Sequence, residues 1–256
     1  RKAYIAIDEI QNVKNLPSVV KFIYDNYKVK FLLTGSSSYY IKNLFSESLA
    51  GRKKIFNVNT LDFGEFLTFK NPALDLKKIS FSKFNENLYN TLNPYYEEYI
   101  KFGGFPEVVL AKTKQSKKDL LNDILDSYIS IDIRQFKNFK DAGELKTLFK
   151  ILASRAGSKI DISKLSAAAG ISRPTLYSYM ELLESTFFVK RLNVISKNPD
   201  VEISKAQKLY ICDNGLLNVL AEVSSGVQFE NCVFNQLQNL GGLNYYSLKT
   251  GKEIDF

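Results

Sequence analysis

YIAIDEIQ at residues 4–11 and KFLLTGSSS at residues 30–38 decide how the N-terminal part of this chain folds. Each stretch starts with a short, mostly apolar run, which is typical of a strand that is buried on both faces of a parallel sheet. Between them, LPSVVKFIYDN at residues 16–26 has apolar residues at helical spacing, with Pro17 in the first turn. The pattern predicts a strand, a helix crossover and a parallel second strand, whose ends meet at one edge of a sheet.

Polar residues follow both predicted strands. Asp8 and Glu9 come directly after the first strand, and Thr34 and Ser36 come after the second. Ligands of open α/β sheets bind at the carboxyl ends of the strands. An Asp at that place can hold Mg²⁺ through water, and the adjacent Glu can orient or deprotonate the water that attacks a terminal phosphate. The alternative is a pair of solvated strand ends without chemistry.

YIAIDEIQ, KFLLTGSSSYYI and SLAGR resemble the Walker B, sensor 1 and downstream arginine segments of archaeal and bacterial AAA-type ATPases with an uncharacterised C-terminal domain. The resemblance continues through LDFGEFL, YIKFGGFPEVVL, KLYICDNGLLN and FENCVFNQL, so it spans nearly the whole chain. It implies an AAA+ fold of the P-loop NTPase class, with ATP and Mg²⁺ as cofactors. The residues that it implicates in catalysis are Asp8, Glu9, Thr34, Ser36 and Arg52. Asp8 would also be the metal ligand, and Arg52 an arginine finger in its own subunit or in a neighbour of a homo-oligomer.

One part of the family's nucleotide site is missing from the sequence. AAA-type ATPases wrap the phosphates in a Gly-rich loop that ends in Gly-Lys-Ser/Thr. The only Gly-Lys pair in this chain is Gly251-Lys252, and Glu253 follows it. We therefore expect the phosphate-binding loop to lie before Arg1 in the natural protein, and the chain as given not to bind ATP tightly.

Composition and charge narrow the possible functions. The formal net charge is +8, from 35 Lys plus Arg against 27 Asp plus Glu. This balance favours polyanionic partners such as double-stranded DNA, although a Lys-rich soluble surface explains it equally well. The chain has no histidine, and its two cysteines, Cys212 and Cys232, lie in apolar surroundings. Zinc sites and histidine-dependent nucleophiles are thus excluded, and a reducing, cytoplasmic compartment is indicated. No apolar stretch approaches the roughly 20 residues of a membrane span, so no membrane partner is expected.

These patterns predict a protein of several domains, of the α/β and α+β classes. The expected order is a partial parallel-sheet core of a P-loop NTPase, a helical linker or lid, a winged helix-turn-helix, and the start of a restriction-endonuclease-like α/β domain. The corresponding residues are 1–70, 71–140, 141–222 and 223–256. Within the first of these, YYIKNLF at 39–45 is predicted to be a helix and KKIFNVNTL at 53–61 a strand.

The stretch IDISKLSAAAGISRPTLYSYMELLESTFFVKRL has the layout of a helix-turn-helix. Asp161 is expected to cap the first helix, and Gly170 to supply the turn, because a left-handed backbone is easy for a residue without Cβ. Ser172 is expected to cap the second helix, with Pro174 in its first turn. The inward residues are predicted to be Ile162, Leu165 and Ala169 in the first helix, and Leu176, Met180 and Leu183 in the second.

In a DNA-binding version of this layout, the second helix enters the major groove and a following hairpin contacts phosphates. The candidate DNA-binding residues are Arg173, Thr175, Tyr177 and Ser178 on that helix, and Lys190, Arg191 and Lys197 on the hairpin. Glu181 and Glu184 argue against base contacts, because negative charge along the helix repels phosphates. The alternative is a winged helix that serves as a packing or protein-contact module.

The last residues, QFENCVFNQLQNLGGLNYYSLKTGKEIDF, predict a helix followed by two strands, NYYSLK and EIDF. They resemble the start of a PD-(D/E)XK nuclease core, in which acidic side chains hold a divalent metal ion. The resemblance makes Asp255 the metal ligand and Glu230 the helical Glu, with Glu253 as a further neighbour. The Glu-x-Lys strand of that core is absent, so cleavage by this chain is not expected. The alternative is a strand with an incidental Asp.

Three functions remain open on this basis. The first is a fragment of an AAA-type ATPase that is coupled to a winged helix, which binds DNA in one version. The second is a non-catalytic DNA-binding regulator, in which the ATPase part is only a scaffold. The third is a metal-dependent nuclease of the PD-(D/E)XK type.

Overall fold

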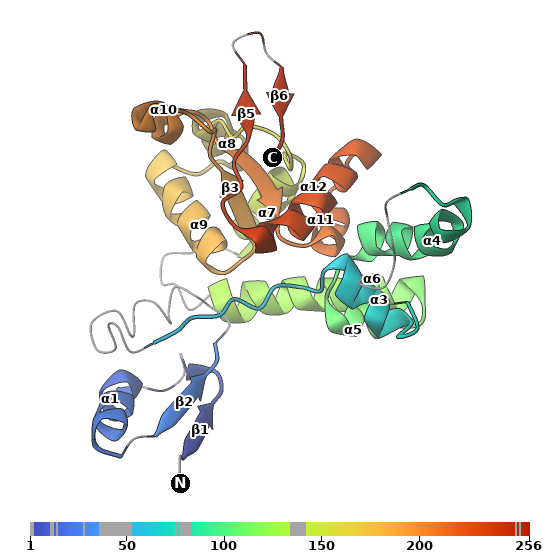
Figure 1. Cartoon of the computed structure of the whole chain (residues 1–256). Coiled ribbons are helices and arrows are strands. Elements are labelled where there is room, and N and C mark those ends of the chain that lie inside the picture. Colours follow the sequence, from blue (N-terminus) through green and yellow to red (C-terminus); the bar gives the residue numbers. More distant parts are fainter. Residues whose placement is uncertain are drawn as a thin grey trace. The chain divides into compact units, whose positions relative to one another are not determined.

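The computed structural model describes residues 3–10, 13, 15–27, 29–35, 53–74, 76, 83–133, 142–248, 250 and 252–256. The chain divides into two compact units, which are described separately below. Unit 1 comprises residues 1–58 with 181–187, and unit 2 comprises residues 59–180 with 188–256. Figure 1 labels most of the helices and strands of both units.

Unit 1 contains the predicted crossover. Strand β1 (Tyr4–Ile7), helix α1 (Leu16–Tyr27) and strand β2 (Lys30–Leu33) follow one another, and the two strands are parallel, with Tyr4 opposite Lys30 and Ile7 opposite Leu33. One face of this sheet is covered: Ile7, Phe31 and Leu33 pack against a buried cluster. The members of that cluster are Ile10, Leu16 and Val20. The strand–helix–strand prediction is therefore confirmed.

Two other predictions for unit 1 have different outcomes. The helix expected at 39–45 lies outside the described residues. The strand expected at 53–61 is wrong, because residues 53–59 form neither helix nor strand. Its apolar side chains are exposed, with Phe56 at 71% and Val58 at 93%. An extended backbone becomes a strand only when a neighbouring strand takes up its hydrogen bonds, and none of the strands that the structure describes pairs with this segment.

The first part of unit 2 is helical, and all of its elements except the first lie within the linker region predicted at 71–140. Its elements are α3 (Phe63–Lys70), α4 (Glu86–Phe102), α5 (Pro106–Leu110), α6 (Lys114–Ser127) and the π-helix η3 (Tyr128–Ile133). A capping box starts α3: Asp62 accepts from the backbone N–H of Glu65, and the Glu65 side chain accepts from the N–H of Asp62. Aromatic rings of α3 and α4 meet in the core, where Phe66 and Tyr99 lie edge to face, 5.2 Å apart.

The next part comprises α7 (Ala142–Ala153), α8 (Ile162–Ala169), α9 (Arg173–Ser185), β3 (Val189–Leu192), α10 (Pro199–Ser204) and β4 (Lys208–Ile211). Asp161 caps α8 through the N–H of Lys164, and Gly170 follows with a left-handed φ of 70°. The Ser172 hydroxyl accepts from Thr175 N at 3.3 Å. These caps and the turn are confirmed. So is the buried stripe of α9, because Leu176, Met180 and Leu183 are fully buried, whereas Leu165 is the only fully buried member of the three predicted for α8.

Strands β3 and β4 are antiparallel, with Val189 opposite Ile211 and Leu192 opposite Lys208. A single antiparallel bridge joins Lys159, which precedes α8, to Lys208. The chain continues through α11 (Asn214–Leu220), α12 (Ser225–Leu237), the 3₁₀ turn η4 (Gln238–Leu240), β5 (Tyr246–Ser247) and β6 (Glu253–Ile254). The predicted helix and two strands at the C-terminal end are therefore present, but each strand has only two residues.

Within the described part of the chain, the fold is a mixture of helices and small sheets, which agrees with the predicted class at that level. No helix that the structure describes has both the length and the apolar character needed to cross a membrane.

Candidate functional site

The ends of β1 and β2 bring together two of the predicted catalytic residues. The Thr34 hydroxyl donates a hydrogen bond to Oδ1 of Asp8. The backbone supports this contact, because Thr34 N donates to Ile7 O at 3.0 Å and Ile10 N donates to Thr34 O at 3.1 Å. Both side chains are exposed, so the pair is open to a ligand from solvent. The parallel register thus places the carboxylate and the hydroxyl at the same sheet edge, as the sequence predicts.

Glu9 has an unusual backbone. Its φ is +49°, in the left-handed region, which costs a residue other than glycine about 1–3 kcal/mol. Such strain is characteristic of active sites, where it can point a side chain in a direction that a relaxed backbone does not allow. Glu9 is exposed beside Asp8. The two remaining predicted catalytic residues, Ser36 and Arg52, lie outside the described residues.

The side-chain oxygen atoms at this sheet edge are of the kind that bind a magnesium ion. Mg²⁺ prefers oxygen ligands, usually one or two carboxylates with several waters and the substrate's phosphates. Asp8 supplies a carboxylate, and the Thr34 hydroxyl holds its orientation. No group of three or more His, Cys, Asp or Glu side chains in the described part of the chain is arranged to hold a metal ion by itself. A metal here would accordingly share its coordination between Asp8, water and phosphate.

The candidate DNA-binding residues differ in how exposed their side chains are. Those exposed on α9 are Arg173, Tyr177 and Ser178, whereas Thr175 is half-buried and its hydroxyl lies 2.7 Å from that of Ser172. On and after β3, Lys190 and Lys197 are exposed and Arg191 is half-buried. Glu181 is exposed and Glu184 is half-buried, so one of the two acidic side chains that disfavour phosphate contact faces solvent.

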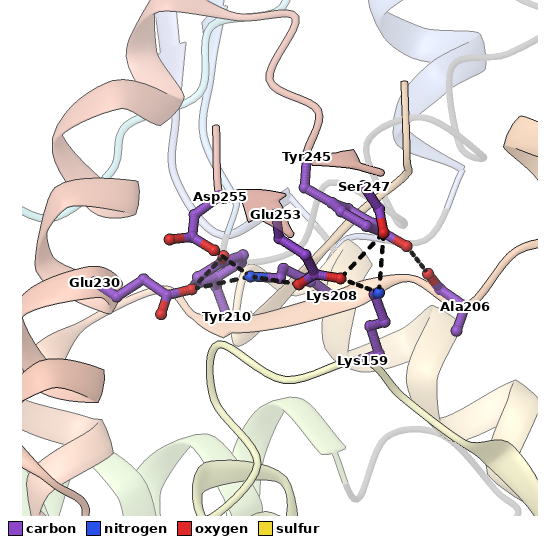
Figure 2. A network of polar contacts seen from close by, with 9 residues as sticks. All are labelled: Lys159, Ala206, Lys208, Tyr210, Glu230, Tyr245, Ser247, Glu253 and Asp255. Carbon is purple, nitrogen blue, oxygen red and sulfur yellow. Dashed lines mark hydrogen bonds and ion pairs between the residues drawn. The ribbon is translucent and has the colours of Figure 1, made fainter. Parts of the chain in front are cut away.

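The side chains of Glu230, Glu253 and Asp255, which were predicted from the nuclease resemblance, lie close together. Figure 2 shows that they surround the side chain of a lysine. Lys208, the first residue of β4, is 4% exposed. Its Nζ lies 3.5 Å from Oε1 of Glu230 on α12 and 3.7 Å from Oε2 of Glu253 on β6, and it also pairs with Asp255. Burial alone would lower the pKa of Lys208, but its hydrogen bond to Asp255 and the three negative charges raise the pKa above the usual value.

A second lysine completes this cluster. Lys159 pairs with Glu253, and its Nζ lies 3.5 Å from the hydroxyl of Ser247. The bond with Lys159 is the main reason why the pKa of Glu253 is lowered. Tyr210 donates to Oε1 of Glu230 at 2.8 Å. Each of the three carboxylates thus has a partner within the protein, and these contacts fasten the β5–β6 hairpin to β4.

Neither lysine of this cluster was predicted from the sequence. Lys208 precedes three apolar residues in KLYI, and all four positions of that strand are buried. A lysine at the start of a buried apolar strand needs a carboxylate partner, because an unpaired buried ammonium is strongly disfavoured. A lysine at the start of this strand was therefore the sequence feature that could have pointed to the cluster. The β-bridge to Lys159 has no signal in the local sequence, since it joins residues 49 positions apart.

Comparisons with known proteins found two family models that match this chain. A family model described as "Domain of unknown function (DUF8612)" matches residues 93–226, just over half of the 256 residues. The chain belongs to the DUF8612 family. A second model, described as "AAA domain", matches residues 1–67 and supports an AAA-type ATPase family for that part. The AAA match contains Asp8, Glu9 and Thr34, and the DUF8612 match contains α8 and α9 but not the three carboxylates around Lys208.

Several curated relatives match this DUF8612 chain over nearly its whole length. An uncharacterised protein of Methanocaldococcus jannaschii is 31% identical over 97% of the chain and 57% of its own length. One of Haemophilus influenzae is 30% identical over 100% of the chain and 62% of its own length. One of Mycobacterium tuberculosis is 22% identical over 98% of the chain and 55% of its own length. The chain thus spans somewhat more than half the length of these relatives. No solved structure matches it.

Proposed function

We propose that this chain is part of an AAA-type ATPase and that the sheet edge at Asp8, Glu9 and Thr34 acts on Mg²⁺-ATP. The hydrogen bond from Thr34 to Asp8 carries this proposal, because it joins the ends of two parallel strands where such sheets bind ligands. The AAA-domain match to residues 1–67 supports it independently.

Each of the three side chains has a distinct role in the proposed reaction. Thr34 holds Asp8 by its hydroxyl, so that the carboxylate keeps one orientation toward the ion and its waters. Glu9 orients the attacking water and accepts its proton, a role that the left-handed backbone at φ +49° supports by directing the side chain. Bound Mg²⁺ neutralises charge on the phosphates. Ser36 as a second sensor and Arg52 as an arginine finger complete the proposed set.

The test is ATP hydrolysis by the natural full-length protein. Glu9→Gln removes the group that accepts the proton and leaves the size of the side chain unchanged, so we expect turnover to fall by about 100-fold or more. Thr34→Val should reduce turnover less, because Asp8 remains. Glu222→Gln is the matched control, since Glu222 is exposed in the loop between α11 and α12 and should have no effect. Unchanged turnover in Glu9→Gln contradicts the proposal.

A second candidate function is duplex DNA binding by residues 142–211. The layout supports it: α7, the bridge at Lys159, α8, α9 and the antiparallel pair β3–β4 follow one another in the order of a winged helix. Arg173 and Tyr177 are exposed near the start of α9, the part of a recognition helix that reaches bases. In this proposal the ATPase rearranges what the winged helix holds.

Binding to duplex DNA should fall steeply with salt, because Lys and Arg release counterions from the phosphates. Arg173→Ala should weaken binding by about 1–3 kcal/mol, and Glu181→Gln should strengthen it by removing a repulsive charge. Lys112→Ala, an exposed cation before α6, is the control and should change little. Undetectable or salt-independent binding removes the DNA proposal and leaves the ATPase proposal intact. DNA binding together with no detectable ATP hydrolysis by the wild-type full-length protein identifies a non-catalytic regulator.

A further inference from the structure

The side chain of Lys208 ends where three carboxylates from two segments converge (Figure 2). Its Nζ forms ion pairs with Glu230 on α12, with Glu253 on β6 and with Asp255, which follows β6. Lys208 is 4% exposed, so its ammonium group does not extend into solvent as that of a surface lysine does. Three negative charges therefore share one positive charge that is fixed inside the protein.

Glu230 is held in place by groups other than Lys208. The hydroxyl of Tyr210 donates to Oε1 of Glu230 at 2.8 Å. Gly157 lies directly beside the same carboxylate: a Cβ at this position would be 3.1 Å from both Oε1 and Oε2, closer than side chains normally pack. Gly157 also has a φ of +74°, which favours glycine. The carboxylate of Glu230 therefore keeps its position even when the cation beside it is changed.

Glu253 is held in a similar way. It lies opposite Ser247 in the β5–β6 hairpin, and the Ser247 hydroxyl donates to its Oε1 at 3.3 Å. Lys159 forms a second ion pair with Glu253. The ion pairs that the structure describes for the other two carboxylates lead to Lys208 alone. Lys208 is thus the cation on which the whole cluster depends, whereas Lys159 affects one of its three members.

A divalent metal ion does not fit beside this ammonium group. The nuclease resemblance implies such an ion on Asp255, at about 2.0–2.1 Å from a carboxylate oxygen in the case of Mg²⁺. Asp255 already pairs with Lys208, so the ion would lie close to Nζ and be repelled by its charge. Burial lowers the pKa of Lys208, but the hydrogen bond to Asp255 and the three negative charges raise the pKa by more, so the ammonium group keeps its proton at neutral pH. The residues present therefore hold an ammonium group rather than a metal ion.

We propose that the ammonium group of Lys208 takes the place of the divalent metal ion that the nuclease resemblance implies. Glu230, Glu253 and Asp255 then form a cation-binding site whose cation belongs to the chain itself. This cation joins α12 and the β5–β6 hairpin to β4, and it offers no coordination position at which a metal ion could activate water. The wild-type chain therefore excludes divalent cations from this site, and removal of the ammonium group opens the site to them.

Binding of Mn²⁺ tests this proposal in the whole chain. Mn²⁺ binds carboxylate oxygens, and as a paramagnetic ion it broadens the NMR signals of nearby amides, so the spectra show where it binds. In Lys208→Ala, the amide signals of Glu230 and Asp255 should disappear at Mn²⁺ concentrations at least about tenfold lower than in the wild type, because a repelling charge has been removed. Signals around Asp8 report separately on the proposed ATPase site.

Two further variants define the site. Lys159→Ala removes the neighbouring ammonium group but leaves Lys208, so we expect the Mn²⁺ response of the wild type. Adding Asp255→Asn to Lys208→Ala removes a ligand without changing the size of the side chain, so the response at Glu230 should return to the wild-type level. Equal broadening in the wild type and in Lys208→Ala overturns the proposal, and so does a response in Lys159→Ala as strong as that in Lys208→Ala.

A measurement on the wild type alone decides the question if Lys208→Ala does not fold. The ¹⁵N signal of the Lys208 ammonium group should be visible at neutral pH, because burial and three partners slow the exchange of its protons with water, whereas that of the exposed Lys112 should be lost to exchange. One equivalent of Mn²⁺ should leave the Lys208 signal and the amide signals of Glu230 and Asp255 unchanged. Loss of these three signals on addition of Mn²⁺, or a Lys208 ammonium group that exchanges as fast as that of Lys112, contradicts the proposal.

Discussion

Gly103 and Gly241 form a matched pair that measures how tightly the chain packs around Asp213. Both glycines follow the last residue of a helical segment, α4 or η4, and their backbones are alike, with φ +73° and ψ −162° at Gly103 and φ +72° and ψ 165° at Gly241. A Cβ on Gly241 would meet no atom within 4 Å, whereas one on Gly103 would overlap the carboxylate of Asp213. Alanine at either position therefore incurs the same backbone strain, and only alanine at Gly103 must also displace a buried side chain.

The expected magnitudes follow from these contacts. Placing alanine in this region, which is almost exclusive to glycine, costs about 1–3 kcal/mol, which is the whole predicted effect of Gly241→Ala. Asp213 is buried and accepts four hydrogen bonds, from the backbone N–H groups of Gly104, Gly215 and Leu216 and from the side chain of Thr60. In Gly103→Ala, Asp213 must also give up at least one hydrogen bond to its buried charge, worth about 1.5–3 kcal/mol. Urea unfolding, followed by circular dichroism, should therefore give a free energy of unfolding about 2–3 kcal/mol lower for Gly103→Ala than for Gly241→Ala. Equal values for the two variants would refute the reasoning, because the backbone strain that both variants share would then account for the whole loss of stability.

Three further predictions concern other sites. Glu9→Gly should raise the free energy of unfolding by about 1 kcal/mol, since glycine relieves the left-handed strain, while ATP turnover of the full-length protein is lost; lower stability would show that the backbone is not strained. Because the pKa of Asp213 is raised from 3.8 to about 6, its contribution to the free energy of unfolding should fall by about 2 kcal/mol as the pH rises from 4 to 6, and Asp213→Asn should remove that slope. Lys208→Met should lower the free energy of unfolding by about 1–3 kcal/mol. This loss is smaller than that expected for a fully buried ion pair, because the carboxylates are partly exposed. The control is Lys146→Met, which breaks an exposed pair with Asp126 and should cost less than about 1 kcal/mol.

Local patterns were sufficient to predict much of this fold. The crossover from β1 to β2 follows from two short apolar runs and a helical spacing between them. The start of α8, its end at Gly170 and the buried stripe of α9 follow from caps and periodicity within a few residues. In all these cases the forces that decide the structure act between near neighbours in the sequence, so a single sequence is enough to show them.

The features that were predicted wrongly or not at all share a different cause. The segment at 53–59 has strand propensity, but propensity does not supply a partner for its hydrogen bonds, and its apolar side chains are exposed. Asp213 lies in KLYICDNGLLN and looks like an ordinary helix cap, because the donors from Gly104 and Thr60 come from more than a hundred residues upstream. Lys208 and Lys159 were missed for the same reason, since only tertiary contacts reveal their three carboxylate partners.

The candidate catalytic site was predictable in part. The adjacency of Asp8 and Thr34 follows from parallel pairing, which the sequence pattern indicates and the structure confirms. The left-handed backbone of Glu9 was not predictable, because nothing in the local sequence favours a positive φ at a glutamate. A strained backbone at this residue is the structural observation that most strengthens the catalytic proposal beyond the sequence.

A single-turnover measurement with the natural full-length protein tests the central claim most directly. Mg²⁺-ATP is mixed with excess protein, and bound nucleotide and released phosphate are followed separately for the wild type and for Glu9→Gln. If Glu9 activates the attacking water, the variant should bind ATP with wild-type affinity and release phosphate about 100-fold more slowly or worse. Phosphate release at the wild-type rate from Glu9→Gln would contradict the proposed ATPase site.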